Sequence, residues 1–218
     1  MGELVHWHSY FQAESCEQSI ILSVYRPACF PISHIMNHKP TSQNLLAICI
    51  ASGDTLVDEA TEVKDAEQVV LHAGLIPGAA ELLHTLNAWG YRLALVADGP
   101  VGSFQNIYTQ HNLLHLFDVF AISGAVGVEK PDERMFHAAL EQLNIAPEAY
   151  SRTLMLGNNL ERDIKGANAL GIISVWIDWA PRRSKIPADA SEVPQYTIKS
   201  PLELLNVIAQ IEEKLNSL

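Results

Sequence analysis

The sequence predicts an α/β protein built on a doubly wound parallel sheet of the Rossmann-like kind. Apolar runs of strand length recur along the chain, at residues 45–50, 93–97, 119–122, 154–156 and 172–177. These runs lack polar alternation, which is typical of strands covered on both faces. Helical patterns lie between them, and repeated strand–helix alternation favours parallel strands joined by crossover helices.

Helical segments are predicted at residues 79–89, 133–143, 162–170 and 201–215. The first and third are followed by Gly90 and Gly171, and glycine commonly ends a helix. The second and fourth place apolar side chains along one face at helical spacing, and the fourth begins with a proline. These segments supply the helices that a doubly wound sheet requires.

Two segments fall outside this alternation. Residues 1–43 precede the first core strand and are interrupted by prolines. We expect them to form an N-terminal extension that packs on a core made of residues 44–218. Residues 182–195 are polar and contain prolines, which predicts a surface loop.

The composition excludes several classes of partner. Hydrophobic residues make up 48% of the chain and charged residues 18%, as in globular proteins. The net charge of −11 argues against nucleic acid and anionic membranes as partners. The sequence lacks an apolar run of membrane-spanning length and the basic start of a signal peptide. The spacing of Cys16, Cys29 and Cys49 favours reduced thiols, so a cytoplasmic protein is expected.

The loops at the carboxyl ends of the predicted strands hold the functional candidates, because ligands of such sheets bind there. These loops read "ASGDTLVD", "ADGP", "SGAVGVEKPD" and "GNNLERDIKGANALG". Their order and spacing resemble the haloacid dehalogenase superfamily over roughly residues 45–215, most specifically at "GVEKPDERMF" and "GNNLERDIKGA".

The resemblance implies a phosphohydrolase site built from four loops. In that family the first loop reads Asp-x-Asp-x-Thr, with the first aspartate as nucleophile and the second as general acid/base. The second loop offers Ser or Thr to a phosphate oxygen, the third offers Lys, and the fourth offers acids to Mg²⁺. These groups position the reactants and stabilise charge on the transferred phosphoryl group.

The first loop departs from this pattern at both carboxylates. Thr55 matches the threonine that ends the motif, which puts Ala51 at the nucleophile position and Gly53 at the acid/base position. Asp54 lies where the family usually has glycine. A methyl group and a hydrogen can neither attack phosphorus nor transfer a proton. The resemblance therefore implies a site whose covalent chemistry is degraded.

The other three loops keep part of the pattern. Ala97 occupies the Ser/Thr position and Asp98 follows it, while Asn158 occupies the position of the leading metal-binding acid. Lys130 and Asp163 match the third-loop lysine and the later aspartate. Mg²⁺ prefers anionic oxygens, and two of those that the family supplies are missing, so no cofactor is expected.

The leading hypothesis is a non-catalytic or very weakly active relative. It binds a small phosphate or other anion, or acts through a protein partner or self-association, without nucleic acid or membranes. The candidate ligand-binding residues are Asp54, Thr55, Asp98, Lys130, Asn158 and Asp163. A purely structural interpretation stands beside it. There Asp54 and Asp98 form turns, Asp163 orients the fourth loop, and residues 1–43 fill the crevice.

The alternative hypothesis is an active hydrolase, a phosphatase or a dehalogenase, with a rearranged site. Asp54 or Asp98 would act as the nucleophile, and Lys130 and Asp163 would support it. The three acids would then converge near Lys130, with Asp163 as the candidate Mg²⁺ ligand. The two hypotheses differ in whether Asp54→Asn or Asp98→Asn removes an activity.

The segment after the first loop predicts a chain without a cap domain. Only about twenty residues separate Thr55 from Pro77, which with Gly78 opens the next helix. Residues 59–72 within this segment carry a pattern that predicts one helix. A single helix is too small for a domain, so a lid would have to come from elsewhere, for which residues 1–43 are the candidate.

Overall fold

The computed structural model describes residues 39–217 of the chain. The extension predicted at residues 1–43 therefore lies almost wholly outside the described residues, and its packing on the core stays a prediction. Among the described helices, none combines the length and the apolar character needed to cross a bilayer.

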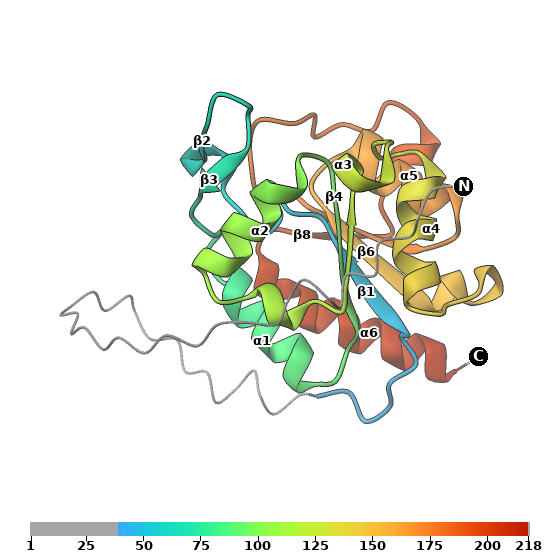
Figure 1. Cartoon of the computed structure of the whole chain (residues 1–218). Coiled ribbons are helices and arrows are strands. Elements are labelled where there is room, and N and C mark those ends of the chain that lie inside the picture. Colours follow the sequence, from blue (N-terminus) through green and yellow to red (C-terminus); the bar gives the residue numbers. More distant parts are fainter. Residues whose placement is uncertain (1–38, 218) are drawn as a thin grey trace. The chain divides into compact units, whose positions relative to one another are not determined.

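A six-stranded parallel sheet with the order β5-β4-β1-β6-β7-β8 forms the centre of the described fold (Figure 1). Its strands are β1 (Ala47–Ile50), β4 (Leu93–Ala97), β5 (Val119–Ile122), β6 (Thr153–Gly157), β7 (Ile173–Ile177) and β8 (Tyr196–Ile198). β1, β4, β6 and β7 are buried along their whole length. The predicted fold class is confirmed, and β8 is a strand that the sequence did not predict.

Register brings three strand ends together. Ile50 at the end of β1 pairs with Leu95 of β4 on one side and with Leu156 of β6 on the other. The loops that follow these three strands therefore leave the same edge of the sheet side by side. This is the edge at which the sequence predicts ligand binding.

Helices cover the two faces of the sheet (Figure 1). α4 (Glu133–Gln142) and α5 (Lys165–Ala169) share a buried cluster with alternate residues of β1, among them Ala47 and Cys49. The crossovers through α1 (Ala79–Ala88) and α2 (Val101–Gln110) join β1 to β4 and β4 to β5. Because such crossovers are right-handed, these helices cover the opposite face.

The prediction of one helix over residues 59–72 is wrong. The structure has a 3₁₀ turn, η4 (Glu59–Thr61), followed by an antiparallel hairpin of β2 (Val63–Lys64) and β3 (Val70–His72). The Asp65 side chain accepts hydrogen bonds from the backbone N–H groups of Glu67 and Val69, at 3.1 and 2.8 Å, and so closes a turn instead of a helix. The insertion is still far smaller than a domain, as the sequence predicted.

The hairpin is held by α2, a helix that the sequence did not predict. The N–H of Val70 donates to Ser103 Oγ at 2.9 Å, and its carbonyl accepts from Asn106 Nδ2 at 2.9 Å. The α2 segment "VGSFQNIYTQ" contains glycine and β-branched residues of low helix propensity. Burial of Phe104, Ile107 and Tyr108 outweighs that propensity.

The remaining predictions agree with the structure except at one helix start. α1, α4 and the last helix, which consists of η9 (Pro201–Glu203) and α6 (Leu204–Asn216), match the predicted segments to within a few residues. The helix predicted at residues 162–170 begins earlier, as the π-helix η7 (Leu160–Ile164), and continues into α5. Residues 182–195 form a loop whose one regular element is the short η8 (Ala190–Glu192).

Candidate functional site

A small cavity of about 100 Å³ lies beyond the carboxyl ends of β1, β4 and β6. It is polar, and both basic and acidic side chains reach it. Its walls are formed by Ala51, Ser52, Gly53, Glu59, Ala97, Asp98, Phe104, Lys130, Asn158, Asn159, Arg162, Asp163 and Arg183. Five sequence-predicted positions of the motifs, namely Ala51, Gly53, Ala97, Lys130 and Asp163, therefore converge with Asp98 and Asn158.

The first loop is a tight turn that closes on itself. The carbonyl of Ser52 accepts hydrogen bonds from the N–H groups of Thr55 and Leu56, at 3.1 and 2.8 Å. Thr55 is fully buried, and its Oγ1 lies 3.4 Å from the Gly53 carbonyl. The Ser52 hydroxyl reaches the Tyr108 hydroxyl at 3.0 Å. Thr55 thus stabilises the loop from within and does not line the cavity.

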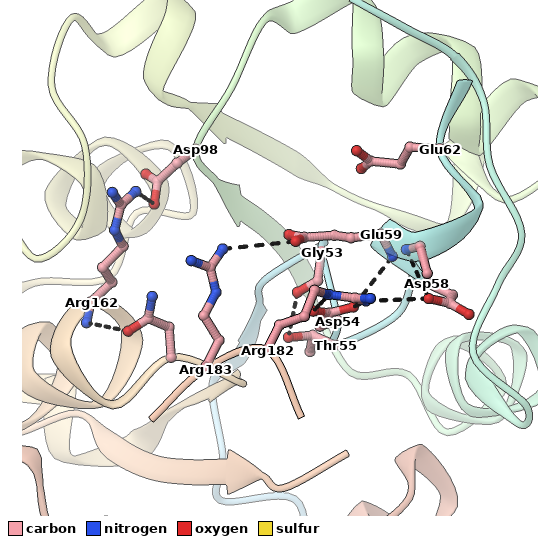
Figure 2. Close-up of polar contacts among 12 residues, drawn as sticks. Gly53, Asp54, Thr55, Asp58, Glu59, Glu62, Asp98, Arg162, Arg182 and Arg183 are labelled. Atoms are coloured by element: carbon pink, nitrogen blue, oxygen red, sulfur yellow. Dashed lines mark hydrogen bonds and ion pairs between the residues drawn. The ribbon is translucent and has the colours of Figure 1, made fainter. Parts of the chain in front are cut away.

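Asp54 points away from the cavity (Figure 2). Its side chain is fully buried and makes a two-pronged contact with Arg182, whose Nε donates to Oδ2 at 2.8 Å. This contact raises the pKa of the Arg182 guanidinium above its ordinary value. Asp54 therefore ties the loop after β7 to the first loop, and the structure does not bring it to the cavity with Asp98 and Asp163.

Lys130 and Asp163 form a buried ion pair at the floor of the cavity. The Lys130 Nζ lies 2.9 Å from Asp163 Oδ1 and also donates to the Val96 carbonyl. The two side chains are 4% and 2% exposed. Asp163 Oδ2 accepts the N–H of Asn159 at 3.0 Å. The pair therefore joins the third and fourth loops to the end of β4.

Asp98 lines the cavity and bridges the same loops. Its Oδ1 accepts the Lys130 backbone N–H at 3.0 Å, and its Oδ2 accepts from Arg162 Nη1 at 3.2 Å. Arg162 also lies 2.9 Å from Glu129. Asp98 is thus held on both oxygens by donors from neighbouring loops.

Asn158 supplies a buried donor with an unmet hydrogen bond. The residue is 8% exposed, and its Nδ2 has no hydrogen-bond partner within residues 39–217. Its backbone carbonyl accepts from Trp176 Nε1 at 2.9 Å, which fixes the backbone there. A buried polar group without a partner is costly, so this wall of the cavity holds a hydrogen-bonding group that residues 39–217 leave unsatisfied.

Glu59 and Arg183 line the cavity but belong to none of the four loops that the sequence resemblance covers. A Cβ atom placed on Gly53 would lie 2.0 Å from Glu59 Oε1, so the Glu59 carboxylate fills the space where a side chain at position 53 would begin. Arg183 Nη2 lies 3.8 Å from Glu59 Oε2 (Figure 2). The sequence offers no motif that marks these two residues, because their role depends on the missing side chain at position 53.

The residues present do not fit the Mg²⁺ ion that the resemblance implies. Among residues 39–217 no group of three or more His, Cys, Asp or Glu side chains is placed to hold a metal. Asp98, Asp163 and Glu59 each already face a basic side chain. The displaced metal site of Asp54, Asp98 and Asp163 is not formed.

Comparison with known proteins gives relatives that share about half of their length with this chain. A glyceraldehyde 3-phosphate phosphatase of Methanopyrus kandleri is 30% identical over 62% of this chain and 57% of its own length. A phosphoserine phosphatase of Thermus thermophilus is 33% identical over 57% of this chain and 47% of its own. A phosphatase structure from Thermococcus onnurineus aligns with a TM-score of 0.54 at 26% identity, covering 62% of this chain and 59% of that one.

The sequence model of the haloacid dehalogenase-like hydrolases matches residues 12–171, which is well over half of the chain. The match spans the first loop, the lysine loop and the fourth loop, whose side chains the structure places around one cavity. The chain therefore belongs to the haloacid dehalogenase-like hydrolase family.

Proposed function

We propose that this chain is an oxyanion-binding member of its family that has lost aspartyl-nucleophile catalysis, and that its ligand is a phosphate group. The observation that carries the proposal is the set of basic side chains at one cavity, Lys130, Arg162 and Arg183. The wall of the same cavity includes Asn158, whose buried Nδ2 has no hydrogen-bond partner within residues 39–217. Next to these donors, Ala51 offers only a methyl group at the nucleophile position. Such a cavity suits a ligand that accepts hydrogen bonds and is bound without nucleophilic attack on it.

The size of the cavity and the names of the relatives support the same ligand class. A volume of about 100 Å³ suits a small polyatomic ion or the phosphoryl end of a larger ligand. The relatives described above act on phosphate esters, as their names state. We further propose a cytoplasmic location and no nucleic-acid or membrane partner, which the acidic charge of −11 supports. Contact with a protein partner or a second copy stays a prediction.

Calorimetric titration with inorganic phosphate, together with a turnover assay, tests the proposal. We expect saturable binding without added metal, and no turnover of a broad phosphate-ester panel with Mg²⁺. Asn158→Ala removes the unmet donor and is expected to weaken binding about tenfold. Asn87→Ala, at an exposed position of α1, is the matched control and should bind as the unmodified chain does. Saturable, Mg²⁺-dependent turnover that Lys130→Ala abolishes would overturn the proposal.

The second candidate function is a phosphatase with a rearranged site. The phosphatase relatives favour it, and of the two predicted nucleophiles only Asp98 lines the cavity. A dehalogenase with the same rearranged site is the less favoured alternative. If this candidate function is right, the chain hydrolyses phosphate esters, Asp98→Asn abolishes the hydrolysis, and Asp54→Asn leaves the rate of the chemical step unchanged. Equal turnover in the Asp98→Asn variant and the unmodified chain would exclude it.

A further inference from the structure

The carboxylate that lies against Gly53 comes from a different element of the chain. Gly53 is outside the left-handed backbone region, so its conformation does not call for glycine. What distinguishes the position is space, since Glu59 Oε1 occupies the volume that a side chain there would take. Glu59 lies six positions along the chain, in η4, and points back over the first loop (Figure 2).

Glu59 is held in this position by its own backbone and by the loop after β7. Its N–H donates to Asp54 Oδ1 at 3.3 Å, and Asp58 caps the turn by accepting from the Ala60 N–H at 2.9 Å. The adjacent Arg182 and Arg183 divide their contacts, the first to Asp54 and the second to Glu59. These contacts therefore hold the Glu59 carboxylate in place at the wall of the cavity.

The surroundings of Glu59 favour its protonated form. Burial is the largest cause that raises the pKa of its carboxyl group, and the neighbouring Asp54 and Glu62 raise it further. Arg183 and Arg182 act in the opposite direction and do not cancel the rise. Glu59 therefore holds a proton up to a higher pH than an exposed glutamate does.

When Glu59 is ionised, the charged side chains around the cavity are balanced. Lys130, Arg162 and Arg183 face Glu59, Asp98 and Asp163. A doubly charged anion that enters this balanced site leaves excess negative charge next to Glu59. A proton between the anion and Glu59 removes that repulsion and supplies a hydrogen bond.

We propose that Glu59 makes the cavity selective for an oxyanion that carries its own proton over one that carries none, such as sulfate. Inorganic phosphate carries such a proton, and so does a phosphate monoester in its monoanionic form. An ionised carboxylate only accepts hydrogen bonds, so it pairs with the hydroxyl of a protonated phosphate. Sulfate has no hydroxyl and binds only after Glu59 itself takes up a proton. This inference rests on the proposed function, because it assumes that the cavity binds an oxyanion.

Titration calorimetry of the full chain with phosphate and with sulfate, over a series of pH values, tests the inference. Sulfate does not change its charge over this range, so its pH dependence reports on the protein. We expect sulfate affinity to fall about tenfold per pH unit above the pKa of Glu59, with about one proton taken up per ion bound. The proton count comes from titrations in buffers of different ionisation enthalpy and needs no variant.

The variant Glu59→Gln removes the acceptor charge and keeps the shape. We expect it to bind sulfate without pH dependence and to lose most of the preference for phosphate, a change of at least about tenfold. Glu67→Gln, which makes the same charge change on the exposed hairpin turn, is the control and should keep that preference.

The outcomes separate this inference from the function on which it rests. Equal affinity of the unmodified chain for phosphate and sulfate, with no proton uptake, would overturn the role of Glu59 and leave the oxyanion site standing. An unchanged phosphate preference in Glu59→Gln would do the same. Absence of binding for both ions at every pH would overturn the proposed function, and the inference with it.

Discussion

The first loop and the floor of the cavity keep the family pattern to very different degrees. At the floor, Lys130 and Asp163 match the pattern, and both are buried and bonded to neighbouring loops. In the first loop, the two positions to which the resemblance assigns catalytic carboxylates hold Ala51 and Gly53, while Thr55, which stabilises the loop from within, matches. The residues that match the pattern therefore stabilise the folded structure. At positions 51 and 53 the residues present have no side chain beyond a methyl group to do so, whereas Asp54, which also departs from the pattern, binds Arg182.

Breaking the ion pair at the floor gives the largest expected effect. Lys130→Ala leaves the Asp163 carboxylate buried and without its cation, which costs about 3–5 kcal/mol of unfolding free energy. Urea denaturation followed by circular dichroism measures this. The double variant Lys130→Met with Asp163→Leu should be less destabilised than the sum of its single variants. If the losses of stability in the single variants simply add, the two side chains act independently. The floor of the cavity would then not be stabilised by their pairing.

Breaking the Asp54–Arg182 contact gives a smaller effect, although Asp54 is fully buried. Arg182 is 37% exposed, so water replaces part of what Arg182→Ala removes, and we expect a loss of about 1–3 kcal/mol. Arg183→Ala, at the neighbouring position, is the matched variant and should cost less than about 1 kcal/mol because its contact with Glu59 is longer and exposed. Equal losses in both would contradict the separate roles assigned to them.

The pH dependence of stability sharpens the comparison further. The pKa of Glu59 is raised in the folded chain, so the folded state binds this proton more tightly than the unfolded state. Below the pKa of Glu59 in the unfolded state, the residue is protonated in both states and its titration does not lower the stability. Stability falls as the pH rises from the unfolded to the folded pKa. Glu59→Gln should therefore raise the melting temperature above this range and not below it, and an equal change at all pH values would contradict the shift.

Placing carboxylates at positions 51 and 53 is expected to have the smallest effect. The double variant Ala51→Asp with Gly53→Asp should turn over phosphate esters no faster than background in the presence of Mg²⁺. The side chain at position 53 must displace Glu59, and Asn158 still presents a nitrogen donor where the family has an acid. A sharper test adds Glu59→Ala and Asn158→Asp to this double variant, which removes both obstacles. Robust turnover in the double variant alone would show that the rest of the site is already competent.

The sequence predicted the sheet well because its strands are buried on both faces and therefore read as apolar runs. β4 and β5 begin and end at the predicted residues. β8 is short and half-exposed, and α2 has low helix propensity, so neither carries a strong local signal. Residues 59–72 were misread because a side-chain turn at Asp65 and contacts with α2 decide their structure.

The candidate site was predictable only where residues lie in the four loops. The motifs located Ala51, Gly53, Asp98, Lys130, Asn158 and Asp163, and the structure places these at one cavity. Asp54 and Thr55 are predicted ligand contacts that do not line the cavity, because Asp54 binds Arg182 of the loop after β7 and Thr55 faces the interior of its own loop. The motifs do not predict Glu59 and Arg183, because both residues reach the cavity from outside the four loops. The neighbouring contact between Arg182 and Asp54 likewise joins residues 128 positions apart in the sequence.

The clamped hairpin has a consequence for how fast a ligand can come and go. The insertion that follows the first loop is fastened to α2 at Val70, whose N–H donates to Ser103 Oγ and whose carbonyl accepts from Asn106 Nδ2. These hydrogen bonds oppose opening of the hairpin, so we expect that its motion does not gate the cavity as the closure of a mobile lid does. Association with a small ion should then follow diffusion and charge, and the residence time should be set by the bonds inside the cavity.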